Sequence, residues 1–260
     1  MQRNILSLLC FPVLLFNCGG GEDATRAEDM ATPEEVMTAE EAVVLQGDGE
    51  WTDLLADGSL DAWHRYGEDE PGTAWKIDGE GALYLDTSNK GEHGVEGGGD
   101  LVTDESYDNY ELELEWKIGE CGNSGLIYNI VESDDYDYPW QTGPELQILD
   151  NSCHPDAKIT THRAGDLYDM ITAEPENVKP AGEWNSIRLV VKDGYVEHWQ
   201  NGAKVVSYTA EGAPWEAMIA KSKFKDMADF GSSTSGKIAL QDHGDPVWFR
   251  NIRIRELDAK

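Results

Sequence analysis

Positive charge is scarce in this chain of 260 residues. Lysine and arginine together number 20 against 51 aspartates and glutamates, so the formal net charge is −31 at pH 7. A chain with this charge repels nucleic acid and anionic lipid, which leaves a neutral or cationic partner and no nucleic acid. The sequence also has no Gly-rich phosphate loop, no nucleophile elbow and no dinucleotide fingerprint.

A long membrane-spanning apolar run is also missing. The apolar run Ile5–Phe16 is too short to cross a bilayer, and it lies behind Arg3 where the h-region of a signal peptide belongs. Cys18 closes this run, with Leu15 three residues before it, as in a lipobox. We therefore expect residues 1–17 to be a lipoprotein signal peptide; ordinary secretion with cleavage nearby is the alternative.

A lipid on Cys18 would be the only contact with the membrane and would place the chain in the cell envelope, as a periplasmic or outer-membrane lipoprotein. Residues 18–46 are then an acidic tether, because they carry eight acids and one arginine and no aromatic residue. Residues 47–260 form the folded domain.

Cysteines are few as well. Cys10 leaves with the signal peptide and Cys18 carries the lipid, so Cys121 and Cys153 remain as an even pair in a compartment that permits disulfides. We expect these two to bond to each other. Two separate buried thiols are the alternative, and the spacing does not indicate a zinc site.

Short alternating segments dominate the rest of the chain. Residues Tyr110–Ile118 (YELELEWKI) alternate strictly between apolar and charged side chains, as in a strand with one buried face. The turns Asp193-Gly194 and Asn201-Gly202 separate three further strands of a meander. One short helix is predicted near Trp215–Ala220. This pattern predicts a single all-β domain, either a β-sandwich or a jelly roll.

The polar residues of the segment 144–151 are arranged for ligand binding. Period-two alternation puts Glu145 and Gln147 on one face of a predicted strand. A carboxylate beside an amide suits sugar hydroxyls or a divalent cation. A solvated strand face is the simpler explanation. Gly122–Gly125 reads as a tight polar turn before the apolar strand that follows.

A second polar group occupies residues 154–169, which contain two histidines and three aspartates. These side chains could ligate a metal or supply an acid and a base, although their spacing matches no strict metal motif. His243 ends a strand beside a turn, a frequent position for a site residue on a β scaffold. His198 lies within the meander and is expected to be structural.

These motifs, taken in order, resemble the 3-keto-disaccharide hydrolase family. The resemblance runs from about Trp51 to Leu257, and each block is weak alone. The blocks that carry it are Asp53-Leu54-Leu55, Leu60-Asp61-Ala62-Trp63, Tyr107-Asp108-Asn109-Tyr110, Gly122-Asn123-Ser124-Gly125, Gly143-Pro144-Glu145-Leu146-Gln147-Ile148-Leu149-Asp150, Ala164-Gly165-Asp166-Leu167-Tyr168-Asp169, Gly182-Glu183-Trp184-Asn185, His198-Trp199-Gln200-Asn201-Gly202, Leu240-Gln241-Asp242-His243-Gly244 and Phe249-Arg250-Asn251-Ile252.

The resemblance implies a concanavalin-like jelly roll whose concave sheet forms the active cleft. It implies cleavage of glycosides that a partner glycoside 3-dehydrogenase has already oxidised to a ketone at C3. The ketone acidifies the C2 proton, so a base can remove it and the group at C1 can leave by elimination, after which water adds. A divalent cation that bridges the ketone and a neighbouring hydroxyl would stabilise the enolate.

The resemblance also assigns residues to roles. Catalytic roles fall to Glu145, His154 and His243, which are the candidate metal ligands as well. The residues expected to bind the sugar are Glu115, Gln147, Tyr168 and Arg250. Tyr128 and Asn129 stand where relatives often have an arginine, so the substrate preference is expected to differ. The alternative is a non-catalytic carbohydrate-binding module, since jelly rolls host lectins as readily as enzymes.

Overall fold

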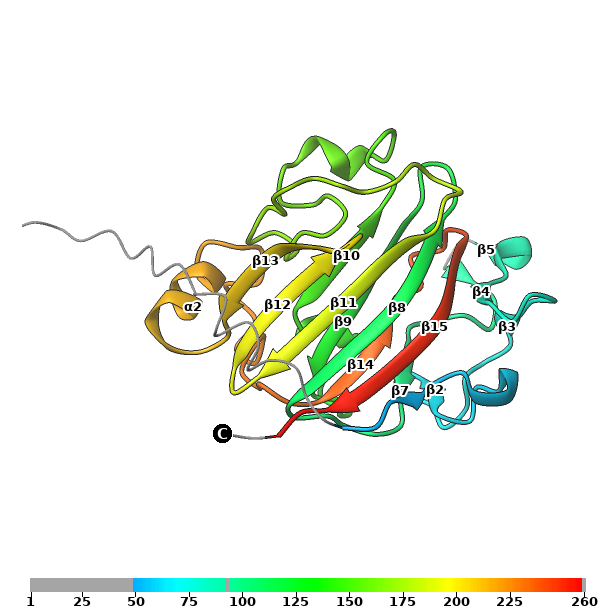
Figure 1. Cartoon of the computed structure of the whole chain (residues 1–260), viewed down its shortest axis with the longest axis horizontal. Helices are drawn as coiled ribbons and strands as arrows, with labels where there is room; N and C mark the ends of the chain where they lie inside the picture. Colours follow the sequence, from blue (N-terminus) through cyan, green and yellow to red (C-terminus); the bar gives the residue numbers. More distant parts are fainter. Residues whose placement is uncertain (1–48, 92–93, 259–260) are drawn as a thin grey trace, which may run out of the picture. The chain divides into compact units, whose positions relative to one another are not determined.

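Two antiparallel sheets form the domain in this computed structural model, which describes residues 49–91 and 94–258 (Figure 1). The larger sheet has eight strands in the order β13-β12-β11-β8-β15-β4-β3, with β1 also paired to β15. The smaller sheet has five strands in the order β10-β9-β14-β7-β2, and β5 and β6 form a separate ribbon. This architecture confirms the predicted all-β jelly-roll sandwich.

The strands and helices are short. Their bounds are β1 Thr52–Asp53, η1 Ala56–Gly58, β2 Trp63–Arg65, β3 Trp75–Ile77, β4 Leu83–Leu85, η2 Thr87–Asn89, β5 Lys90–Gly91, β6 Gly94–Val95, β7 Leu101–Thr103, β8 Tyr110–Ile118, β9 Asn123–Ile130, η3 Pro139–Gln141, β10 Glu145–Leu149, η4 Pro155–Lys158, β11 Asn185–Lys192, β12 Tyr195–Gln200, β13 Ala203–Thr209, α2 Gly212–Ile219, β14 Lys237–Leu240 and β15 Val247–Glu256.

The predicted meander is confirmed. Strand β8 has the bounds that its alternation predicted, and β11, β12 and β13 follow one another in the larger sheet. Both hairpin turns have positive φ at their two central residues, namely 49° and 75° at Asp193 and Gly194. Turns with positive φ at both central residues match the twist of the strands that they join. Asp-Gly and Asn-Gly pairs are favoured there because these residues tolerate positive φ. Helix α2 lies where the short helix was predicted.

The main core lies between the two sheets. Trp116, Tyr128, Phe249 and Leu83 are among its largest side chains, and each has less than 2% of its surface exposed. Fully burying a side chain of this size stabilises the fold by about 1.5–3 kcal/mol. This core fixes the two sheets against each other and so fixes the strands that carry the site.

A buried polar network crosses the core. His198 Nε2 lies 2.7 Å from the Tyr128 hydroxyl, which lies 2.6 Å from the Tyr208 hydroxyl, and the other ring nitrogen of His198 lies 3.3 Å from the Gly165 carbonyl. Burial lowers the pKa of His198 to about 4, so the ring is neutral at pH 7. His198 thus connects the larger sheet to the loop 162–171 and has the structural role expected from the sequence.

The two residues that differ from the usual arginine also lie in the core. Tyr128 contacts His198, and Asn129 is 1% exposed and accepts a hydrogen bond of 3.1 Å from the Tyr110 hydroxyl. Their side chains therefore bond to other core residues.

The disulfide prediction is confirmed and one turn prediction is wrong. Cys121 and Cys153 are bonded, with their α-carbons 5.0 Å apart. The segment Gly122–Gly125 is not a tight turn throughout, because β9 already begins at Asn123 and Ser124 and Gly125 pair with β10. Glycine and asparagine resemble turn residues in the sequence, but here the neighbouring strands supply the hydrogen bonds that make them a strand.

The signal peptide 1–17, the lipidated Cys18 and the tether 18–46 lie outside the described residues. Within residues 49–91 and 94–258, no helix is both long and apolar enough to cross a membrane.

Candidate active site

The outward face of the smaller sheet carries the polar residues singled out from the sequence. Strand alternation turns Leu146 and Ile148 toward the core and leaves Glu145 and Gln147 on the opposite face. The strand register places Glu145 of β10 in one row with residues of β9, β14 and β7. That row continues through Ile127, Ala239 and Val102.

Glu145 is the most perturbed acid of this face. It is 6% exposed, and burial raises its pKa to about 8, opposed by the positive charge of Lys223 and reinforced by Asp100 and Asp156. No hydrogen bond to its carboxyl group is found within the described residues. A buried carboxyl that lacks protein partners and titrates near neutral pH is suited to exchange a proton with a ligand.

The glycine at position 125 makes room for Glu145. A β-carbon built on Gly125 would lie 2.2 Å from Glu145 Oε1 and 2.8 Å from its carboxyl carbon. Real β-carbons essentially never approach so closely, so any larger residue would push the carboxylate away. Gly125 of the Asn-Ser-Gly motif therefore leaves room for the carboxylate of Glu145. The interpretation of this motif as a turn did not predict that role.

Lys223 faces Glu145 and was not found from the sequence. Burial lowers its pKa, opposed by the negative charges of Glu145, Asp169 and Asp156. Its Nζ lies 4.0 Å from the centre of the Tyr168 ring and 5.9 Å from that of Trp140. The signal that could have indicated it is the run Lys221-Ser222-Lys223-Phe224-Lys225, a positive cluster in a strongly acidic chain.

The loop 154–171 brings an aromatic ring and two acids to the same place. Tyr168 stacks on His162 with ring centres 4.2 Å apart, and Asp156 lies near its hydroxyl. His162 Nε2 lies 2.9 Å from Asp169 Oδ1. Burial and the charges of Asp156, Glu145 and Asp169 raise the pKa of Tyr168 well above its usual value. The predicted sugar-binding residue Tyr168 therefore lies beside Glu145 and Lys223.

The two candidate histidines lie near each other. The rings of His154 and His243 are 6.4 Å apart between centres and almost perpendicular. His154 Nδ1 accepts the backbone N–H of Asp156 at 3.2 Å, so its proton lies on Nε2 in the neutral form. His243 is exposed in the turn after β14. The disulfide holds Cys153, the residue before His154, against Cys121 at the β8–β9 turn.

Two further aspartates lie between these groups. The backbone N–H of Asp242 donates to Asp100 Oδ1 at 2.9 Å, and the Asp242 carboxylate accepts the backbone N–H of Gly99 and of Gly244 at 2.7 Å each. Burial raises the pKa of Asp100 to about 7. Beside them, the amide oxygen of Gln241 is buried without a hydrogen-bond partner in the described structure.

Gln147 has a more local role. It is 1% exposed, and its side-chain oxygen accepts the backbone N–H of Ile148 at 3.0 Å. It lies opposite Gly125 in the register, next to Glu145 along the strand. Its position on the cleft face is the expected one.

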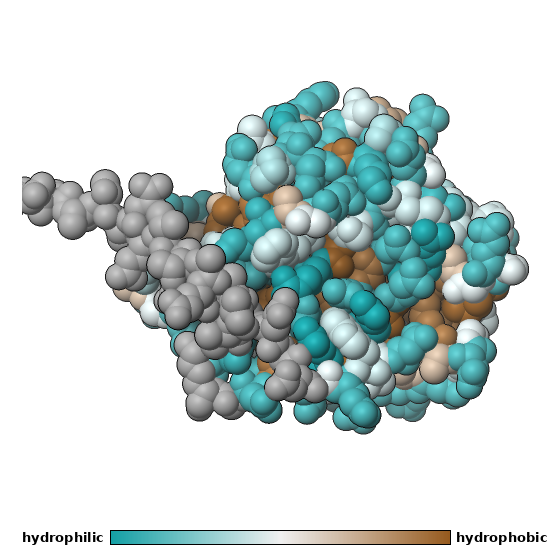
Figure 2. Space-filling view, viewed as in Figure 1, coloured by the Kyte–Doolittle hydropathy of each residue, from teal (hydrophilic) through white to brown (hydrophobic). Residues whose placement is uncertain are grey.

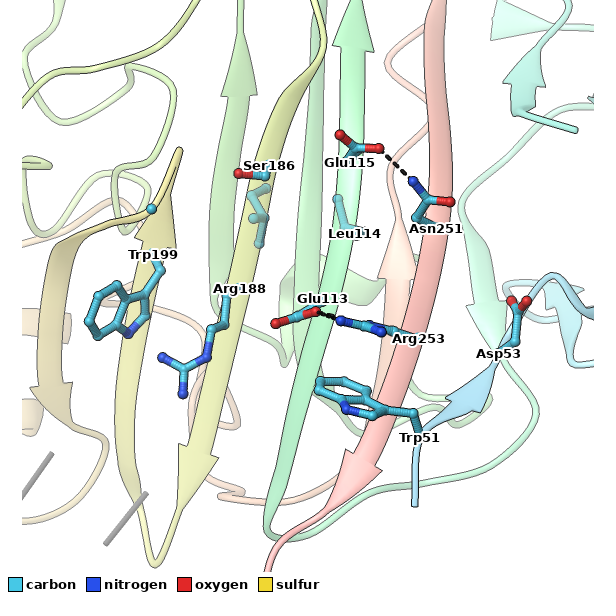
Figure 3. A pocket seen from close by; sticks show the side chains of 12 residues that line it. Trp51, Asp53, Glu113, Leu114, Glu115, Ser186, Arg188, Trp199, Asn251 and Arg253 are labelled. Atoms are coloured by element: carbon cyan, nitrogen blue, oxygen red, sulfur yellow. Dashed lines mark hydrogen bonds and ion pairs between the residues drawn. The ribbon is translucent and has the colours of Figure 1, made fainter. Parts of the chain in front are cut away.

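Glu115 and Arg250 do not join this group. They lie on β8 and β15 of the larger sheet, where Glu115 Oε2 accepts a hydrogen bond from Arg250 at 2.8 Å. The same oxygen accepts a hydrogen bond from Asn251 at 2.6 Å (Figure 3). Although burial raises the pKa of Glu115, these two bonds lower it on balance. The pair is separated from Glu145 because their strands belong to the other sheet.

Their surroundings form a different hollow of about 720 Å³, between Trp51 and Trp199. This face carries mostly hydrophilic side chains with hydrophobic ones between them (Figure 2). Arg253 pairs with Glu113 at 2.5 Å and lies over the Trp51 ring, so the charges there neutralise one another. This hollow is larger than that beside His243, but the carboxylates of Glu113 and Glu115 in its lining are already paired with Arg253 and Arg250.

A divalent cation was expected on Glu145, His154 and His243. The donor types suit a cation, but within residues 49–91 and 94–258 the only three ligand groups that converge within 4.8 Å are Cys121, Asp150 and Cys153. The two cysteines of this group are bonded to each other and cannot act as thiolate ligands. Within these residues, the ligand atoms of Glu145, His154 and His243 are thus not drawn together into a three-ligand site.

Known proteins resemble this chain over most of its length. Residues 50–255 match the family described as the 3-keto-alpha-glucoside-1,2-lyase-like domain. A 3-keto-disaccharide hydrolase of Bacteroides thetaiotaomicron is 34% identical over 276 aligned positions, which cover 94% of this chain and 95% of that protein.

Solved structures give the same result. A protein of Parabacteroides distasonis assigned to the glycosyl hydrolases is 32% identical, with a TM-score of 0.72 over 86% of this chain and 99% of its own. A Bacillus subtilis protein with a galectin-like fold is 13% identical, with a TM-score of 0.52 over 83% of this chain and 99% of its own, and shares the fold alone. This chain therefore belongs to the family of 3-keto-alpha-glucoside-1,2-lyase-like domains and is a hydrolase of glycosides.

Proposed function

We propose that this enzyme cleaves glycosides whose C3 hydroxyl has been oxidised to a ketone, by elimination and hydration. The observation that carries the proposal is Glu145, a buried carboxyl with no hydrogen bond from any residue that the structure describes, whose pKa of about 8 keeps it protonated at neutral pH. An acid in this state can donate a proton or a hydrogen bond where negative charge develops. The family and its 3-keto-disaccharide hydrolase relative support the same substrate.

The reaction has two balanced steps. A base removes the C2 proton, the electrons form a C1=C2 double bond conjugated with the C3 ketone, and the C1–O bond breaks as the leaving oxygen takes a proton from an acid. Water then adds its oxygen to C1 and a proton to C2, which gives the free 3-keto sugar. This route avoids the oxocarbenium-like transition state and the paired carboxylates of ordinary glycosidases.

The geometry supports a division of roles. Glu145 is the proton donor, because burial holds it neutral. His154 offers an N–H at Nε2, since its Nδ1 accepts a backbone hydrogen bond, and it stabilises the enolate oxygen. We assign the base to His243, whose exposed ring lies within 6.4 Å of His154. Tyr168, stacked on His162 and beside Lys223, orients the sugar.

The substrate implies a partner. Because the C3 ketone must be present before cleavage, a glycoside 3-dehydrogenase has to act upstream. We further propose that the chain works in the cell envelope, held there by a lipid on Cys18, where exported glycosides are available.

The test is release of p-nitrophenol from p-nitrophenyl 3-keto-glucoside by the purified protein, with the unoxidised glucoside as control. Turnover of the keto substrate alone supports the proposal, and deuterium at C2 of the product formed in D2O supports elimination. Cleavage of the unoxidised glucoside at a similar rate contradicts it. A parallel assay with EDTA shows whether a cation is required, since loss of turnover with the chelator would mean that one completes the site.

A further inference from the structure

A hollow of about 670 Å³ opens directly beside the catalytic residues. It is bordered on one side by Gln241 and His243 of the site and on the other by the aromatic side chains of Tyr138 and Trp140. Of these four residues, only His243 has a role in the proposed mechanism. A space of this size, next to the reacting groups, can hold a further part of the substrate.

The two aromatic rings stack on each other, so the pair offers its outer faces to a ligand. Tyr138 and Trp140 are stacked with ring centres 5.5 Å apart and an angle of 13° between their planes. Tyr138 is 52% exposed, the most exposed of the large hydrophobic side chains in the described part of the chain. Rigid exposed aromatic rings with a polar tip are the usual anchors of ligand and partner binding.

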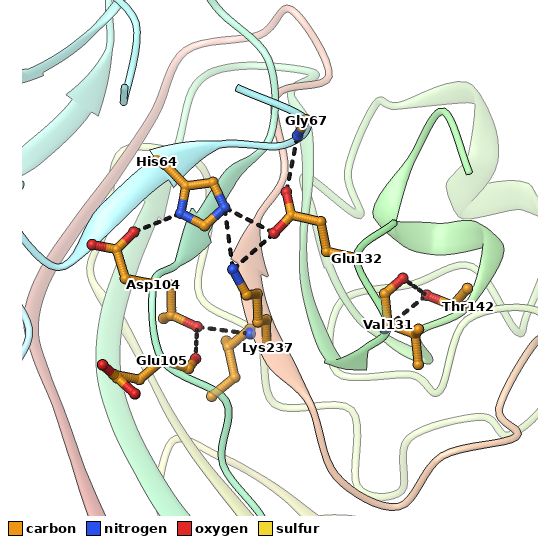
Figure 4. Close-up of polar contacts among 10 residues, drawn as sticks. His64, Gly67, Asp104, Glu105, Val131, Glu132, Thr142 and Lys237 are labelled. Carbon is orange, nitrogen blue, oxygen red and sulfur yellow. Dashed lines mark hydrogen bonds and ion pairs between the residues drawn. The ribbon is translucent and has the colours of Figure 1, made fainter. Parts of the chain in front are cut away.

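The segment that carries these rings is held at both ends. At its start, Glu132 accepts the backbone N–H of Gly67 at 2.9 Å and lies 2.8 Å from Lys237 Nζ and 2.9 Å from His64 Nε2 (Figure 4). At its end, Thr142 Oγ1 accepts the backbone N–H of Val131 at 3.1 Å.

Within the segment, the Gln141 side chain accepts the Tyr138 backbone N–H at 2.8 Å. The exposed ring is therefore presented by an ordered backbone, which reduces the entropy lost when a ligand binds.

The surface continues into the active site. Trp140 packs, together with Tyr66, on an apolar patch of the sheet that includes Ile127 and Ala239. Ile127 pairs with Glu145 in the register, and Lys223 Nζ lies 5.9 Å from the Trp140 ring. Trp140 thus lies between the catalytic groups and Tyr138, and a substrate bound at Glu145 would extend along it.

Gln241 brings a buried, unpartnered polar atom to the wall of this hollow. Gln241 is 9% exposed, its side-chain oxygen has no partner within the described residues, and its residue lines the hollow. A buried amide oxygen left without a donor costs about 1–3 kcal/mol, so a ligand hydroxyl that donates to it would bind favourably.

The charge of the lining restricts the ligand. Asp137 and Asp242 balance Arg65 and Lys90, and the raised pKa of Asp100 leaves that carboxyl partly neutral at pH 7, so the lining has little net charge and suits a neutral ligand. A neutral ring with a flat apolar face and a hydroxyl at its edge meets all of these features. The apolar face of a pyranose and the ring of a phenol share that chemistry.

We propose that this hollow is the leaving-group subsite of the enzyme, in which a neutral ring stacks on Tyr138 and Trp140 and a hydroxyl donates to Gln241. This inference rests on the proposed function. It makes Tyr138 a residue that determines specificity, although it takes no part in the chemistry.

The test compares three 3-keto-glucosides that differ only in the leaving group: methanol, p-nitrophenol and glucose. In Tyr138→Ala, we expect kcat/KM for the p-nitrophenyl and glucosyl substrates to fall about 5-fold relative to that for the methyl substrate, mostly through KM. Tyr138→Phe keeps the ring and should keep the wild-type ratio. The matched control is Tyr84→Ala, which removes a partly exposed tyrosine from the larger sheet and should also keep it.

Loss for only one of the two ring-bearing substrates identifies the source of the ring as phenol or sugar, and supports the subsite. An equal loss for all three substrates, or no loss for any, overturns it. If the wild type cleaves no 3-keto-glucoside, the proposed function fails separately. Calorimetric binding of p-nitrophenyl glucoside and maltose to Glu145→Gln, with and without Tyr138→Ala, then decides the subsite: weaker binding with alanine supports it, and equal or absent binding overturns it.

Discussion

The carboxylate of Glu145 occupies the space that a side chain on Gly125 would fill. A β-carbon on Gly125 would lie 2.2 Å from Glu145 Oε1, although the two residues come from neighbouring strands. Because Glu145 is 6% exposed, it has little room in which to move aside. The missing side chain on β9 therefore fixes the position of the acid on β10.

Gly125→Ala should reduce activity far more than it reduces stability. A shift of the acid by about 1 Å can lower kcat/KM by about 10²-fold. The matched control is Gly79→Ala, because nothing lies within 4 Å of a β-carbon built there. Activity on a 3-keto-glucoside and the thermal midpoint would be measured for both variants. Equal activity of the two would show that Glu145 adjusts without loss.

The pH profile of the enzyme should follow Glu145. Its folded pKa is raised to about 8, so the protonated form is present below that pH and is lost above it. If this form is the proton donor, kcat/KM falls as the pH rises through 8, and Glu145→Gln removes the alkaline limb together with most of the activity. A rate that instead rises through pH 8 would make Glu145 the base.

Lys223 should shift the alkaline limb of the pH profile. Its positive charge lowers the pKa of Glu145, so Lys223→Met should move the alkaline limb to higher pH. Lys225→Met serves as control, because the Lys225 side chain is 56% exposed and pairs with Asp226. Profiles of kcat/KM against pH for the two variants provide the comparison, and a shift in both would mean that net charge alone is responsible.

His198 should make the fold sensitive to acid. Its folded pKa of about 4 lies below the unfolded value of 6.5, so the unfolded chain binds more protons between these values and stability falls as the pH drops from 6.5 to 4. The loss contributed by this residue is about 3 kcal/mol. Urea unfolding at pH 7 and pH 4.5 should show a smaller pH effect in His198→Gln than in the wild type. If the pH effect is the same in His198→Gln as in the wild type, the acid sensitivity comes from carboxylates and not from His198.

The disulfide should stabilise both the fold and the position of His154. Cys121 and Cys153 are 32 residues apart in the sequence, and closing a loop of that length stabilises a protein by about 3 kcal/mol. The double variant Cys121→Ser with Cys153→Ser should unfold at lower urea and show a lower kcat/KM, because His154 follows Cys153 directly. Reduction of the wild type should reproduce both effects. Full activity in the double variant would mean that η4 alone positions His154.

The sequence alone determined the elements that depend on local pattern. The alternation of Tyr110–Ile118 specified β8 and its buried face, and the Asp193-Gly194 pair specified a hairpin, because both properties depend on neighbouring residues. The same alternation put Glu145 and Gln147 on one face. The resemblance placed Glu145, Tyr168, His154 and His243 in one site, and the structure groups them in two pairs on the same side of the smaller sheet.

The assignment of each residue to a sheet, and to a face of that sheet, required the packed fold. Alternation shows which face of its strand each of Glu115 and Arg250 occupies. It does not show that these strands lie in the sheet opposite to that of Glu145. Lys223 comes from a segment far along the chain from Glu145, and no local pattern encodes the approach of its charge to that carboxyl group. The position of a charged group in a site depends on long-range packing, and its pKa depends on how deeply it is buried. Both are fixed only when the sheets come together.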